Sequence, residues 1–273
     1  MQTGCLRPYN LEVNMKQIQY ATLLGGFFIL ALALGFIFQI PFVTGIWPWP
    51  EGRLSHLFIG SILAAVSAAA IWIGWTGELG AMAAGALNVF VISIASTYYF
   101  LVLALGENHS EILWHGYISS LMAVISFMAF QWSRRLEMRD TLPTPMLVRL
   151  SFAVFTIALL FTGAGLVLNL PIFPWPLKPT SSVIFGCIFL GDAFYFLYGL
   201  FRPRWNNALG QLLSFLAYDL VLIAPFLLLF KTVKPEHQLS LTVYVAVLIY
   251  SGGIAVYYLL INQPTRIWNS NKT

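Results

Sequence analysis

Charged side chains are scarce in this chain, and their scarcity excludes an ordinary water-soluble protein. Of the 273 residues only 9% are Asp, Glu, Lys or Arg, whereas soluble domains contain about 25%. Hydrophobic residues make up 59% of the chain and aromatic residues 16%. Runs without Lys, Arg or Glu recur, each long enough to cross a hydrocarbon layer about 30 Å thick. The composition therefore predicts an integral membrane protein.

Other absences exclude particular kinds of chemistry. The two cysteines, Cys5 and Cys187, are far apart in the chain, so no disulfide or CxxC motif is expected. The sequence has no Walker A loop and no HExxH, GxSxG, CxxCH or DDxxD motif. No lysine lies inside an apolar run, which excludes a retinal Schiff base. No segment outside the runs is long enough for a folded soluble domain, so neither nucleotide-driven transport nor nucleic-acid binding is expected.

Eight apolar runs, each bounded by turn or charged residues, predict an all-α fold with eight transmembrane helices. The predicted spans cover residues 20–40, 55–75, 80–105, 111–132, 146–170, 182–201, 207–230 and 240–262. One long connection carries several charges, SRRLEMRDTLPTP at residues 133–145, and it divides the chain. The prediction is an N-terminal tail (1–19), a four-helix unit (20–132), this linker (133–145), a second four-helix unit (146–262) and a C-terminal tail (263–273).

The two units share an ordered set of prolines, glycines and tryptophans, which predicts an internal duplication. GFIFQIP at residues 35–41 matches GLVLNLP at residues 165–171 with an offset of 130 residues, and the Pro-Trp-Pro triplet at 48–50 matches that at 174–176 with an offset of 126. Because each unit has an even number of spans, both copies share one topology. A parallel repeat with a pseudo-twofold axis along the membrane normal is therefore expected.

Orientation is predicted from the distribution of Lys and Arg between the two sides of the membrane. Ten Lys and Arg lie on the side of the membrane that holds both tails and the linker, and four lie on the opposite side. This excess predicts that both termini lie in the cytoplasm. The predicted location of the protein is a cell membrane, and specifically a bacterial inner membrane. The proline-tryptophan turns then face outward, and Trp47, Trp49 and Trp175 are predicted to anchor the fold at the lipid headgroups. A tryptophan-lined vestibule or a ridge that docks a partner is the alternative interpretation of these residues.

Two acids in the middle of predicted spans are the strongest candidates for function. A carboxylate there costs about 3 kcal/mol on insertion scales, so Asp192 and Asp219 should face the bundle and find partners. Tyr195, Tyr218 and Gln211 are the polar residues expected to line the same site. The first unit has valines at the matching positions. One interpretation is a binding site for an ion or a small solute, and the other is a structural hydrogen bond between helices.

Histidines form a second, weaker candidate site near the outer surface. It comprises His56, His109, Glu111 and His115. A zinc-like ion could bind to such a set, and a haem or pigment bound by His56 and His115 is a further alternative. Solvated surface histidines are the simpler interpretation, and the sequence does not identify a cofactor.

Three hypotheses for function follow. The first is a transporter for a small solute or an ion that uses the two acids. The second is a non-catalytic subunit or assembly factor of a larger membrane complex, with contacts to lipid, pigment or haem. The third, a membrane enzyme with the histidines at its site, is the weakest, so enzymatic activity is not expected. Expected partners are the lipid bilayer and either other membrane proteins or further copies of this chain.

Overall fold

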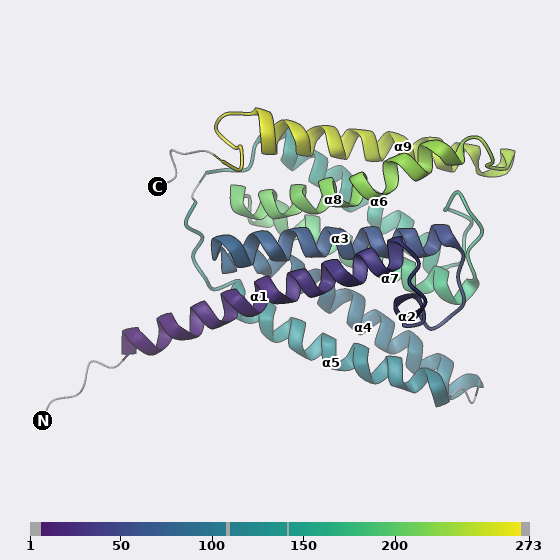
Figure 1. The fold of residues 1–273 in the computed structure, drawn as a ribbon, viewed down its shortest axis with the longest axis horizontal. Helices are drawn as coiled ribbons and strands as arrows, with labels where there is room; N and C mark the ends of the chain where they lie inside the picture. The colour runs from purple at the N-terminus through teal and green to yellow at the C-terminus, as the bar shows by residue number, and fades with distance from the viewer. Residues whose placement is uncertain (1–6, 108–109, 141, 269–273) are drawn as a thin grey trace, which may run out of the picture.

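The computed structural model describes residues 7–107, 110–140 and 142–268, which fold into α-helices without a β-sheet (Figure 1). Eight helices are long and apolar enough to cross a membrane, as predicted. They are α1 (Arg7–Ile37), α3 (Arg53–Thr76), α4 (Met82–Glu107), α5 (Ser110–Ser133), α6 (Met146–Val167), α7 (Pro179–Phe201), α8 (Trp205–Leu229) and α9 (Pro235–Val256). The shorter elements are α2 (Pro41–Thr44), a 3-10 turn at Leu79–Ala81 and a π-helical turn at Tyr257–Ile261.

The first helix is longer than its predicted span. It begins at Arg7, whereas the sequence predicts a span from residue 20 preceded by a tail. The apolar stretch able to cross a membrane covers Met15–Ile37, so the additional turns are more polar and extend beyond it. Apolar runs mark where a helix can enter lipid, and helical hydrogen bonding continues past that boundary.

The helices are arranged in pairs that run along a common direction. α1 lies against α3, α4 against α5, α6 against α7 and α8 against α9. Between the pairs, α3 packs on α8 and α4 packs on α7. Figure 1 shows that α1 begins and α9 ends at the same end of the bundle, which we call the terminal end. The opposite end holds α2 and the proline-tryptophan turns and is called the turn end.

α1 and α6 end in the same hydrogen-bonded motif. Gln39 has φ 55° and Asn169 has φ 58°, the left-handed conformation that closes a Schellman motif. The amide of Ile40 donates to the carbonyl of Gly35 at 2.8 Å, and the amide of Leu170 donates to that of Gly165 at 2.9 Å. A proline follows at once in each case and cannot continue the helix. These residues stop both helices firmly and turn the chain at the turn end.

Two glycines allow close helix contact within the bundle. A Cβ atom on Gly60 of α3 would lie 2.7 Å from the side chain of Ile37 and 3.0 Å from the carbonyl oxygen of Ala33. A Cβ atom on Gly186 of α7 would lie 2.7 Å from the carbonyl oxygen of Gly163. Small residues at such points let backbones approach in lipid, where no hydrophobic effect draws helices together. The pairs α1–α3 and α6–α7 therefore both depend on a glycine.

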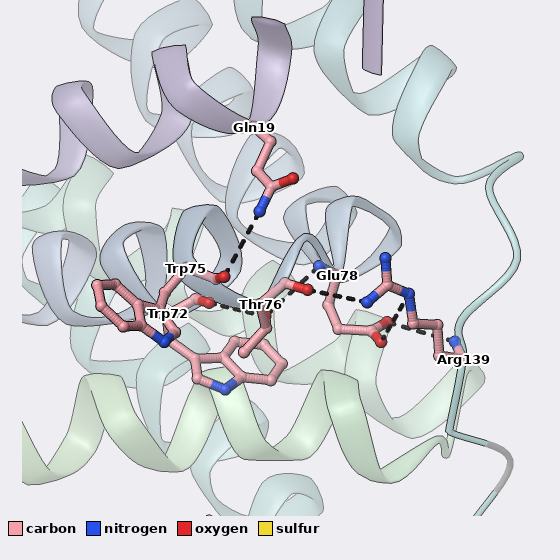
Figure 2. A network of polar contacts seen from close by, with 6 residues as sticks. All are labelled: Gln19, Trp72, Trp75, Thr76, Glu78 and Arg139. Carbon is pink, nitrogen blue, oxygen red and sulfur yellow. Dashed lines mark hydrogen bonds and ion pairs between the residues drawn. The ribbon is translucent and has the colours of Figure 1, made fainter. Parts of the chain in front are cut away.

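At the terminal end, a polar network fastens the linker to the turn between α3 and α4 (Figure 2). Glu78 is 7% exposed, and its carboxylate accepts the backbone N–H of Arg139 at 3.3 Å. The Arg139 guanidinium lies 3.9 Å from the same carboxylate and donates to the carbonyl of Thr76 at 3.1 Å. Gln19 of α1 donates to the carbonyl of Trp75 at 3.5 Å. The network thereby joins three segments that are distant in sequence.

Candidate functional site

A cavity of about 790 Å³, partly open to the surface, lies between the helices, and residues of all eight long helices line it. Its wall extends from Ile172 and Glu236 at the turn end to Ala81 and Met82 at the terminal end. Most of the wall is apolar. Polar side chains line it near the middle of the helices, where Asp192 and Asp219 are found. A volume of this size lies within the range of about 300–1,000 Å³ that is usual for sites binding small molecules.

Asp192 lies in the middle of α7 and has a polar partner on another helix. Its Oδ1 accepts a hydrogen bond from Nδ2 of Asn88 on α4, with 2.7 Å between the two atoms. Gly191 precedes it, and a Cβ atom on Gly191 would lie 2.7 Å from the side-chain oxygen of Asn88. A glycine is therefore needed here for α4 and α7 to approach closely enough for the hydrogen bond.

Asp219 lies in the middle of α8, is 5% exposed and has its partner on α9. Its Oδ2 accepts a hydrogen bond from the hydroxyl of Ser251 at 2.9 Å, whereas Oδ1 is buried without a partner. Gly252 lies beside this carboxylate, and a Cβ atom on Gly252 would stand 3.3 Å from Oδ2. The second acid thus has one satisfied oxygen and one with unused hydrogen-bonding capacity.

The other polar residues predicted for this site also lie between helices. Tyr195 and Tyr218 line the cavity, and Gln211 does not. The Tyr195 hydroxyl lies 3.3 Å from the hydroxyl of Ser214, and the Gln211 amide donates to the Tyr195 backbone carbonyl. The Tyr218 hydroxyl shares a short hydrogen bond with that of Tyr244 on α9. Gln211 therefore positions α7 on α8 from behind the cavity wall.

The structure places the histidine candidates less completely. The ring of His56 lies 6.0 Å from that of Phe36, and the ring of His115 lies 5.6 Å from that of Phe100. His109 lies outside the described residues, as does the side chain of Glu111. Among the side chains that are described, no group of three or more His, Cys, Asp or Glu is placed to hold a metal ion.

The three tryptophans of the turns are folded back against the protein at the turn end. Trp175 is 7% exposed, and its indole Nε1 donates to the hydroxyl of Ser55 on α3 at 3.1 Å. Trp47 packs against Phe185 and Trp49, with ring centroids 5.5 Å and 6.2 Å away. These indoles therefore close the turn end of the bundle, and anchoring at lipid headgroups stays a prediction.

The cavity also has polar residues that the sequence analysis did not select: Asn88, Ser251 and Tyr244. Each contacts a selected residue, and each could have been noticed as a polar side chain within an apolar span. The sequence lacked any sign of which helix faces which. α4 meets α7 and α8 meets α9 only in the folded chain.

Eight helices that are long and apolar enough to cross a membrane fit a polytopic α-helical membrane protein. No protein-family model, curated protein or solved structure matches the chain.

Proposed function

We propose that this protein is a carrier that moves a small solute or an ion across its membrane, with Asp192 and Asp219 as the binding acids. The observation that carries the proposal is the single cavity lined by both acids and by residues of all eight long helices. A site lined by every helix pair suits alternating access, in which helix pairs rock about a bound solute. Ionisable residues within spans commonly mark such a path.

We further infer that the carrier is an internal duplication, with units 20–132 and 146–262 joined by the linker 133–145. The matched Schellman motifs at Gln39 and Asn169 support this duplication, as do the glycine contacts at Gly60 and Gly186. The helix pairing agrees too, because α1–α3 corresponds to α6–α7 and α3–α8 corresponds to α7–α4. With this correspondence the pseudo-twofold axis runs along the bundle, and the cavity lies on it.

The proposed location is a cell membrane, with the terminal end in the cytoplasm. The ten Lys and Arg of the tails, the linker and neighbouring segments support this orientation against four on the turn end. In this arrangement the cavity would open alternately past the network of Glu78 and Arg139 and past the proline-tryptophan turns. The bilayer is then the main partner of the outer helix faces.

The alternative functions are less well supported by the geometry. A structural subunit or assembly factor is expected to have a filled, dry core, and a cavity of about 790 Å³ favours a carrier instead. A membrane enzyme with an outer-face site at His56, His109 and His115 stays a hypothesis, because His109 lies outside the described residues.

The test is transport by purified protein in sealed lipid vesicles. Counterflow uptake would be measured for a panel of labelled amines, amino acids, sugars and inorganic cations. We expect accumulation of at least one solute, and its loss in Asp219→Asn and in Asp192→Asn. Glu137→Gln is the matched control, since it removes an exposed carboxylate from the linker. Transport by both Asn variants at the rate of the unmodified protein would overturn the proposal.

A further inference from the structure

Aromatic rings contribute to the wall of the cavity that the two acids also line. Among them are Phe155, Phe189, Phe196, Phe215, Tyr218 and Tyr244. The faces of such rings attract a cation, more strongly where water is excluded than in exposed positions. An aromatic wall also offers a large apolar contact area to the body of a ligand. These rings therefore favour a ligand that is both cationic and bulky.

The charges that line the cavity all have one sign. Asp192, Asp219 and Glu236 contribute side chains to the wall, and within the described residues no Lys, Arg or His does. Two ion pairs, which join Arg139 to Glu78 and Lys234 to Glu236, do not involve the two central acids. Neither of the two central acids has a cationic side chain as a partner. A positive charge in the cavity would thus have to come from a ligand.

Two residues that line the cavity each have a buried acceptor atom without a hydrogen-bond partner. Oδ1 of Asp219 and Oδ1 of Asn88 are both buried without a hydrogen-bond partner, on residues that are 5% and 7% exposed. Leaving a buried acceptor unpaired is energetically unfavourable. Both atoms belong to residues that line the same cavity. Unpaired acceptors beside the acids add to the negative electrostatic character of this part of the protein, which favours a cationic ligand.

We propose that the cavity binds an organic monocation, a single ammonium-like or phosphonium-like centre with a bulky aromatic or aliphatic body. The cation lies between Asp192 and Asp219, and the body contacts the surrounding rings. A metal ion is disfavoured as the occupant because it needs several oxygen ligands around one point, and the wall is mostly apolar. This proposal deepens the carrier function given above and rests on it for the role of binding.

The experiment compares two probes of the same shape and opposite charge. Purified full-length protein in detergent is titrated with tetraphenylphosphonium and with tetraphenylborate, and binding to protein-free micelles is subtracted. Saturable binding of tetraphenylphosphonium is expected, with tetraphenylborate at least about tenfold weaker because the wall is anionic. This comparison on the unmodified protein does not depend on any variant folding.

The variants then locate the bound charge. Asp192→Asn with Asp219→Asn should weaken tetraphenylphosphonium binding by about tenfold or more, and Phe215→Leu by a few fold through the lost ring face. Glu137→Gln should leave the affinity unchanged. Equal binding of the two probes, no saturable binding of the phosphonium, or undiminished binding by a folded double Asn variant would overturn the proposal.

The result separates this inference from the carrier function. Binding could be charge-selective and dependent on the acids while the vesicles transport nothing in the panel. That result would support the proposed ligand class and overturn the carrier function. Transport of a sugar or a metal ion without charge-selective binding would support the carrier function and overturn the proposed ligand class.

Discussion

Asn88 on α4 and Asp192 on α7 are joined by a hydrogen bond 2.7 Å long between the amide Nδ2 and the carboxylate Oδ1. The two residues lie on either side of the linker, so this bond connects the first four long helices to the last four. It lies on the cavity wall, where it stabilises the packing of α4 on α7 and fixes the direction of the acid.

Replacing Asn88 should therefore destabilise the bundle. Asn88→Ala leaves the Asp192 carboxylate without its donor, and we expect a loss of about 1–2 kcal/mol in the free energy of unfolding. Unfolding in mixed micelles by SDS would measure it. A double-mutant cycle with Asp192→Ala should give a coupling of at least about 0.6 kcal/mol. Strictly additive effects would mean that the bond contributes nothing.

The glycines of the tightly packed pairs should not accept a methyl group. Gly60→Ala and Gly186→Ala each force a Cβ atom against backbone atoms about 3 Å or less away, so both should lose roughly 1–3 kcal/mol of stability. Gly25 of α1 has no atom within 4 Å of its would-be Cβ, and Gly25→Ala is the matched control. The same micelle unfolding assay applies. If all three variants were equally stable, the helices would not pack as closely at Gly60 and Gly186 as the structure indicates.

The left-handed residues that end α1 and α6 should respond unequally to glycine. Gln39→Gly removes the steric cost of a positive φ and should stabilise the protein by up to about 1 kcal/mol. Asn169→Gly should change little, since asparagine tolerates this conformation better than glutamine. Gln39→Val and Asn169→Val should both destabilise, because a β-branched side chain is poorly accommodated there. Stabilisation by valine at either position would contradict the Schellman geometry.

The eight membrane spans could be predicted because the length of an apolar run is a local property of the sequence. As a helix, each of these runs is long enough to cross a hydrocarbon layer. A helix also satisfies all of its backbone hydrogen bonds within one segment, as lipid requires. Helix ends at Gln39 and Asn169 were also marked locally, by the prolines that follow them. The extension of α1 before Met15 could not be predicted in this way, because its polar residues form no apolar run.

The partners of the acids could not be predicted in the same way. Asp192 and Asp219 stand out because charged residues are rare in spans, but Asn88 and Ser251 resemble many other polar residues in apolar helices. Which of them contacts an acid depends on the facing of α4 against α7 and of α8 against α9, which arises from packing along whole helices. The inward orientation of Trp175 has the same origin, since Ser55 comes from a distant segment.

The network of Figure 2 should show charge coupling across the linker. Arg139→Ala leaves the carboxylate of Glu78, which is 7% exposed, without its cation. The loss of stability caused by Arg139→Ala should therefore be larger in the unmodified protein than in the Glu78→Gln variant, where no charge is left uncompensated. Thermolysin cleavage within residues 133–145 would report release of the linker. Because the guanidinium is largely exposed, the effect on unfolding should stay near or below about 1 kcal/mol. Equal cleavage rates in both backgrounds would exclude the coupling.

The proposed orientation places the two ends of the bundle in different compartments, and single cysteines test it. Cys5 and Cys187 are first replaced by alanine, and a cysteine is then introduced at Glu137 at the terminal end or at Lys231 at the turn end, both exposed. Because the excess of Lys and Arg lies at the terminal end, a membrane-impermeant maleimide added to intact cells should label the cysteine at position 231. It should label the cysteine at position 137 only after permeabilisation. The reverse pattern would invert the protein in its membrane and place the proline-tryptophan turns in the cytoplasm, while labelling of both positions in intact cells would contradict a single orientation.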